Sequence, residues 1–155
     1  MMTANQHRKL TFSNLDEALA EAERLAAADH FTTGHHSFAQ ILNHLALAND
    51  MVTGRVIPPK MPLLVRLVMP FIRSKILNGP VKPGVKLPKK SESFFWPNRS
   101  LNVQDALASF RQSVDHYKKN GPLPVHPVFG KATREQIDQM NLRHAAMHLG
   151  FVHTR

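Results

Sequence analysis

Four amphipathic segments, each preceded by a residue that caps helix N-termini, most constrain the fold of this 155-residue chain. Asn14, Ser37, Asn102 and Thr133 each stand before apolar residues that recur every three or four positions. Ser37 and Thr133 are followed three residues later by glutamine, which completes a capping box. The pattern predicts helices over about residues 15–28, 38–53, 103–120 and 134–151. No alternation of useful length predicts a strand, so we expect an all-α protein.

A long connection between the second and third helices, about residues 54–101, favours a four-helix bundle in which this connection crosses over. The chain has a normal size for one unit, so we expect a single domain over residues 1–155. It contains no cysteine, which excludes disulfides and thiolate metal ligands. The first residues carry no apolar stretch, so we expect no cleavable secretory signal and a cytoplasmic protein.

The crossover is rich in proline, because residues 58–97 contain eight of the eleven prolines. Within it, residues 61–77 could form one or two short helices that Pro70 kinks or splits. This stretch is a poor membrane span, although it could form an amphipathic helix that lies at an interface. Its apolar character is also compatible with a homodimer. The aromatic residues 94–96 are expected to dock the crossover onto the bundle, and Trp96 could wall a pocket.

The net charge of +9 is concentrated in the same segment. Between Gly54 and Arg99 there are ten lysines and arginines against Glu92 alone, while ten basic and ten acidic residues cancel elsewhere. Such a segment is usually a solvated surface, but it could also bind carboxylates, nucleic acid or an anionic surface. Because no recognised DNA-reading motif accompanies the charge, nucleic acid is the less favoured partner.

Three histidines stand on apolar helical faces: His44 in the second segment, and His144 and His148 in the fourth. Residues four apart project from one face of a helix, so the last two could present two imidazoles to one divalent ion. A single histidine on such a face is more often a hydrogen-bonded core residue. Two inward imidazoles side by side each need a partner, and a shared metal ion with His44 as third ligand would satisfy both.

The remaining histidines are weaker candidates. His126 precedes the fourth helix and could either anchor a loop or reach the mouth of the bundle. We expect His35 and His36 to be solvated, and we identify no partners for three others, His7, His30 and His153. Asp138 and His126 are the nearest candidates for a general base, but the sequence does not bring either one to the metal.

Three stretches carry a resemblance to a known superfamily: SFAQILNHLA, HPVFGK followed by TREQ, and RHAAMHL. Over about residues 10–151 the chain resembles the DinB-like superfamily, and in particular a branch described as a domain of unknown function. The resemblance implies a four-helix bundle of up-down-down-up topology with His44, His144 and His148 as ligands to nickel or zinc. It also implies transfer of a low-molecular-weight thiol such as bacillithiol, mycothiol or glutathione, or metal-dependent hydrolysis.

The chain departs from this branch at two positions. Ile137 stands where an aromatic residue is frequent, and Met147 stands where a further histidine is frequent. Neither position belongs to the three ligands, but both would alter the pocket beside them.

Three functional hypotheses therefore remain open at this point. The first is a metal-dependent enzyme, either a thiol S-transferase or a hydrolase, that acts on a small-molecule substrate. The second is a non-catalytic bundle with a structural metal. The third is a protein that binds an anionic surface or nucleic acid through the basic residues 54–99.

Overall fold

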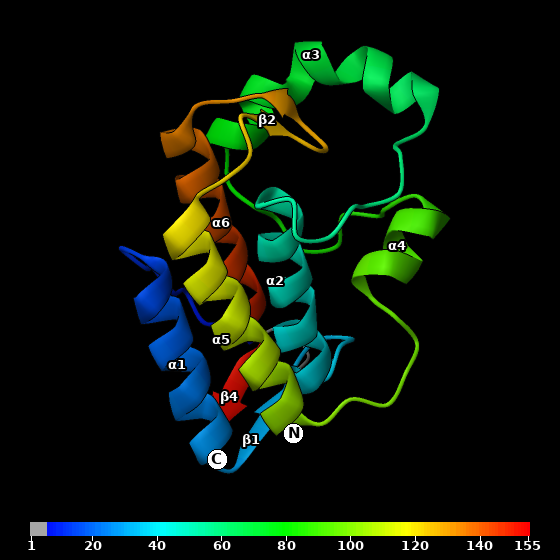
Figure 1. The fold of residues 1–155 in the computed structure, drawn as a ribbon. Coiled ribbons are helices and arrows are strands. Elements are labelled where there is room, and N and C mark those ends of the chain that lie inside the picture. Colours follow the sequence, from blue (N-terminus) through cyan, green and yellow to red (C-terminus); the bar gives the residue numbers. More distant parts are fainter. Residues whose placement is uncertain (1–5) are drawn as a thin grey trace.

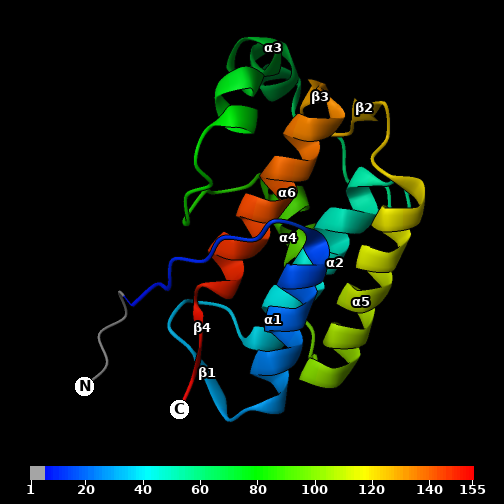
Figure 2. The ribbon, with the colours of Figure 1, turned by 90° about the vertical axis from the view of Figure 1, so that its left-hand side faces the viewer.

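The computed structural model describes residues 6–155 and is mostly helical. Within this range there are six helices and four short strands (Figure 1). Four of the five helices with thirteen or more residues lie side by side with their axes roughly aligned, and Figure 2 shows the same group from a second side. These helices are α1 (Leu15–Ala27), α2 (Phe38–Val52), α5 (Val103–Asn120) and α6 (Arg134–Leu149).

The predicted starts of all four long helices are confirmed by their caps. The Asn14 and Asn102 side chains each accept a hydrogen bond from the backbone N–H three residues on. Ser37 and Thr133 form complete capping boxes with glutamines at the same spacing. At the other end, Gly121 closes α5 with a positive φ of 66°, a conformation that glycine adopts without steric cost.

Helix α2 lies at the centre of the packing. It packs most extensively against α5 and also contacts α6, while α1 packs against both α5 and α6. Because α2 is surrounded in this way, twelve of its fifteen residues are buried. A buried polar pair crosses to α5, where the Asn49 amide donates to the Ser113 hydroxyl at 3.1 Å. A residue on the inner face of α2 is therefore enclosed by protein.

The strands are short pieces that the sequence analysis did not predict. Strand β1 (His30–Thr32) pairs antiparallel with β4 (Val152–Thr154), and β2 (Val125–His126) pairs with β3 (Gly130–Lys131). Two or three residues are too few to give a period-two pattern. The pairing of β4 also explains why α6 ends at Leu149 rather than near Phe151 as predicted.

The N-terminal segment closes the C-terminal end of α6. The Arg8 N–H donates to the Gly150 carbonyl at 2.9 Å, and the Arg8 guanidinium donates to the carbonyls of Leu149 and Val152. A ring nitrogen of His7 donates to the Met147 carbonyl at 2.7 Å. The donors to Met147, Leu149 and Gly150 satisfy carbonyls that a helix end leaves without intrahelical partners.

The crossover contains two helices, α3 (Leu63–Asn78) and α4 (Lys89–Phe95). Helix α3 continues through Pro70 as one helix, so of the two effects expected of this proline, a kink or a split, the split is absent. It is anchored near its C-terminal end, where Leu77 is buried and its carbonyl accepts a hydrogen bond from Arg143 of α6. Phe95 is buried in the core as expected for the aromatic run. Among the described residues, no helix is both long and apolar enough to cross a bilayer.

Candidate metal centre

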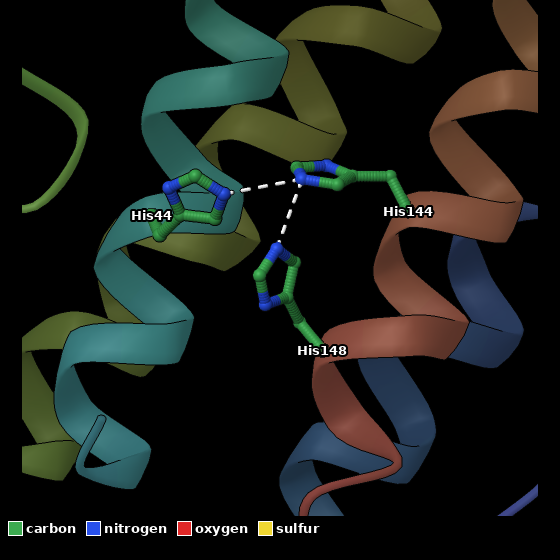
Figure 3. A group of neighbouring side chains, drawn as sticks. All are labelled: His44, His144 and His148. Atoms are coloured by element: carbon green, nitrogen blue, oxygen red, sulfur yellow. Dashed lines mark hydrogen bonds between the residues drawn. The ribbon is translucent and has the colours of Figure 1, made fainter. Parts of the chain in front are cut away.

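The structure brings the three predicted histidines together between α2 and α6. His44 projects from α2, and His144 and His148 project toward it from successive turns of α6 (Figure 3). The Nε2 atom of His144 lies 3.1 Å from the Nε2 of His44 and 3.1 Å from the Nε2 of His148. One nitrogen from each ring lies within 4.8 Å of the other two, which is close enough to hold one metal ion.

The imidazole of His44 is held in one orientation by the crossover. Its Nδ1 lies 3.2 Å from the carbonyl oxygen of Phe95. A carbonyl can only accept, so Nδ1 carries the proton and Nε2 presents its lone pair to the other two histidines. Metal-binding histidines commonly have such a partner on the second ring nitrogen. The arrangement therefore selects the tautomer that a metal ligand requires.

Burial keeps the three imidazoles neutral. His44 is only 5% exposed, and burial together with repulsion from His144 holds its pKa well below the ordinary range. Burial lowers the pKa of His144 to about 4, and burial with its two neighbours lowers the pKa of His148 further. At neutral pH all three rings therefore offer lone pairs without competition from protons.

The spacing of the nitrogens fits a metal ion better than a set of hydrogen bonds. The Nε2 of His144 faces two other Nε2 atoms, yet it carries at most one proton in the neutral ring. In a tetrahedral site with metal–nitrogen bonds of about 2.0–2.1 Å, neighbouring ligand nitrogens are about 3.3 Å apart, and cis ligands of an octahedral site are about 3.0 Å apart. The separations from His144 to His44 and from His144 to His148 are both 3.1 Å, which lies between these two values.

An indole ring covers one side of the triad. Trp96 stacks on His44 with ring centroids 3.9 Å apart and planes at 7°, and it meets His148 edge-on at 5.4 Å. On its other face it stacks on His36 at 3.6 Å and 9°. Trp96 therefore lies against two of the three histidines, His44 and His148. His36, which was expected to be solvated, is half-buried, because the indole covers one face of its ring, whereas His35 is exposed.

His126 anchors a loop and is not part of the triad. It is buried in the hairpin before α6, where its Nδ1 accepts hydrogen bonds from the backbone N–H groups of Val128 and Phe129 at 3.0 and 3.1 Å. Its ring also stacks on Phe129. Of the two alternatives left open by the sequence, the structure supports the loop anchor.

Asp138 has partners outside the triad, and Met147 lines a different cavity. The Asp138 carboxylate accepts a hydrogen bond from the Tyr117 hydroxyl and pairs with Arg134 at 3.2 Å. Burial and this carboxylate raise the pKa of Tyr117 well above its ordinary value, so the phenol stays protonated. Met147 lines a separate cleft of about 410 Å³ between the N-terminal segment, α6 and the loop after α3.

Sequence reasoning missed the groups that support the triad. His36 directly precedes the cap of α2, so its position beside the site follows from the start of that helix. No sequence pattern predicts that its ring stacks on Trp96, which lies sixty positions away in the chain. The Phe95 carbonyl is a backbone group and has no sequence signal. Partners also exist for the three histidines left without one, since His7, His30 and His153 each contact a backbone carbonyl.

Comparison with known proteins identifies the family of the chain. No curated protein and no solved structure matches it. The sequence model of one family, described as "Protein of unknown function (DUF1569)", matches residues 4–155 and therefore nearly the whole chain. The chain belongs to the DUF1569 family of proteins of unknown function.

Proposed function

We propose that this protein is a metal-dependent enzyme whose divalent ion is held by His44, His144 and His148. The observation that carries the proposal is the convergence of the three Nε2 atoms. From the resemblance noted in the sequence, we expect nickel or zinc as the ion. We also expect the four long helices to follow the up-down-down-up order of the DinB-like superfamily.

The donor set supports a catalytic role for the ion. Among the described residues, the group that could hold an ion here consists of histidines alone. An ion held by neutral imidazoles keeps its full charge, so with an open position it can acidify bound water or hold a substrate thiol as thiolate. The protein itself orients His44 through Phe95 and shields one side of the site with Trp96.

Of the two reaction types, thiol transfer is the better supported. A hydrolase would need a base that takes a proton from water near the ion. Asp138, the carboxylate nearest in sequence, is engaged by Tyr117 and Arg134 instead. A thiol whose proton has passed to solvent needs no such base. We therefore propose S-transfer of a low-molecular-weight thiol, with hydrolysis as the alternative reaction.

The proposal is tested with the full chain loaded with Ni²⁺ or Zn²⁺. Conjugation of glutathione, bacillithiol or mycothiol to an electrophile is measured beside hydrolysis of a panel of esters. Turnover should require the ion and should be lost in His44→Ala. Asp138→Asn is the matched control, because it removes a charged group of α6 that lies outside the triad, and it should leave turnover unchanged.

A structural metal would give a different result. If the chain binds the ion and loses much thermal stability on chelation, yet turns over neither thiols nor esters, the ion is structural and the proposed enzyme activity is wrong.

A further inference from the structure

Large exposed hydrophobic side chains gather on α3, a helix that contributes no residue to the triad. Phe71 is 87% exposed and Leu64 is 73% exposed, and other large apolar residues of the same helix are exposed to a lesser degree. These others are Leu63, Leu67, Val68, Ile72 and Ile76. Contiguous apolar patches on a protein surface commonly mark an interaction site. Helix α3 is therefore the strongest candidate for an interaction surface outside the triad.

The exposed side chains form one stripe that faces away from the protein. Leu64, Leu67, Val68 and Phe71 are spaced by three and four residues and so share one face of the helix. The opposite face carries Met69, which is buried. Helix α3 lies at one end of the molecule, beyond the ends of the long helices (Figures 1 and 2). The stripe is accessible to a large partner without movement of the bundle.

Helix α3 and the rest of the crossover are positively charged, with Lys75 on the face of the stripe and Arg66 and Arg73 on the opposite face. Arg66, Arg73 and Lys75 lie on α3, which has no acidic residue, and the crossover from 54 to 99 carries ten basic residues against one acidic residue. Arg55 pairs with Asp50, and within residues 6–155 no other cation of the crossover lies in an ion pair. The partner should therefore be anionic as well as able to receive an apolar stripe.

Negative charge and an apolar environment are two requirements that distinguish the possible partners of the α3 stripe. A second copy of the chain would bring two crossovers of net charge +9 against each other, which is repulsive. A nucleic acid would satisfy the charge but would leave the leucine and phenylalanine side chains in water. An anionic lipid bilayer satisfies both, because an amphipathic helix buries its apolar face among the acyl chains while basic residues contact the headgroups.

We propose that α3 docks this protein on the surface of anionic lipid membranes. The helix lies in the plane of the interface with the stripe of Leu64, Leu67, Val68 and Phe71 toward the acyl chains. The basic residues of the crossover attract the chain to the charged surface, and the stripe retains it there. The bundle and its histidines remain on the aqueous side.

The test measures sedimentation of the full chain with vesicles of phosphatidylcholine alone or with about 30% phosphatidylglycerol, a composition rich in anionic charge. Binding should require the anionic lipid and should weaken at high salt. The variant Leu64→Ser with Phe71→Ser should lose at least tenfold in affinity for the anionic vesicles. Because both side chains are exposed, its circular dichroism and melting temperature should match the native chain.

The matched control is Ile57→Ser with Val85→Ser. These residues are also 87% and 73% exposed and lie in the same basic crossover, but not on α3. This variant should bind anionic vesicles like the native chain. Equal loss in both variants, binding that survives Leu64→Ser with Phe71→Ser, or no binding at low salt would overturn the proposal. A native dimer that this α3 variant converts to monomer, without vesicle binding, would assign the stripe to a second copy instead.

Discussion

Replacement of His126 by asparagine should make the protein more resistant to acid. The ring of His126 is 3% exposed, and burial lowers its pKa to about 4 from an ordinary value of about 6.5. Protonation would also remove the lone pair of Nδ1 that accepts from Val128 and Phe129. The folded state therefore favours the neutral ring.

The sign and size of the effect follow from linkage. Because the folded pKa is depressed, the contribution to stability is fully present above about pH 6.5 and is lost as the pH falls toward 4. A pKa shift of His126 from about 6.5 in the unfolded chain to about 4 in the folded chain lowers the free energy of unfolding by about 2 kcal/mol at pH 5 and about 3 kcal/mol at pH 4. Asparagine cannot titrate, but its side-chain oxygen can accept the same two N–H groups in an Asx turn.

The assay is urea unfolding of the native chain and His126→Asn at pH 7 and pH 5, with chelator present in both. Both proteins should lose stability on acidification, because the triad also has lowered pKa values. The variant should lose about 2 kcal/mol less than the native chain. Equal losses would refute the account of His126, and weaker metal binding by the variant would contradict its assignment as a loop anchor.

Three further substitutions test contacts around the site and the core. Trp96→Leu removes the ring stacked on His44 and should weaken metal affinity about tenfold. The affinity is measured by competition with a chelating dye, and an unchanged value would show that the indole does not support the site. Gly150→Ala would place a Cβ 2.5 Å from a backbone oxygen of the N-terminal segment, so the melting temperature should fall by several degrees, and an unchanged value would contradict this close approach. Ser113→Ala should lower the free energy of unfolding in denaturant by about 1–2 kcal/mol, because it leaves the Asn49 amide without its acceptor. Adding Asn49→Leu to Ser113→Ala removes the unpaired amide and should recover part of that free energy.

The sequence predicted the helices well where local chemistry determines them. The four caps fix the starts of α1, α2, α5 and α6, since a side chain three residues before a backbone N–H is a local interaction. The convergence of His144 and His148 follows from helical periodicity alone. Their meeting with His44 depends on the packing of α2 against α6, which the apolar faces indicate but do not determine.

Features set by distant parts of the chain were not predictable. Pro70 is tolerated inside α3, although its position alone favours a break. The stacking of His36 on Trp96 joins two segments that the crossover separates in sequence. In the same way, β1 exists only because the end of the chain returns to pair with it.

The most direct test of the central claim is the metal content of the full chain, measured by elemental analysis on protein that has never passed over a metal-affinity column. We predict about one divalent transition-metal ion per chain, and its loss in the variant His144→Ala with His148→Ala. Native protein that stays metal-free after incubation with Ni²⁺ or Zn²⁺, or a double variant that retains the ion, would contradict the assignment of these histidines.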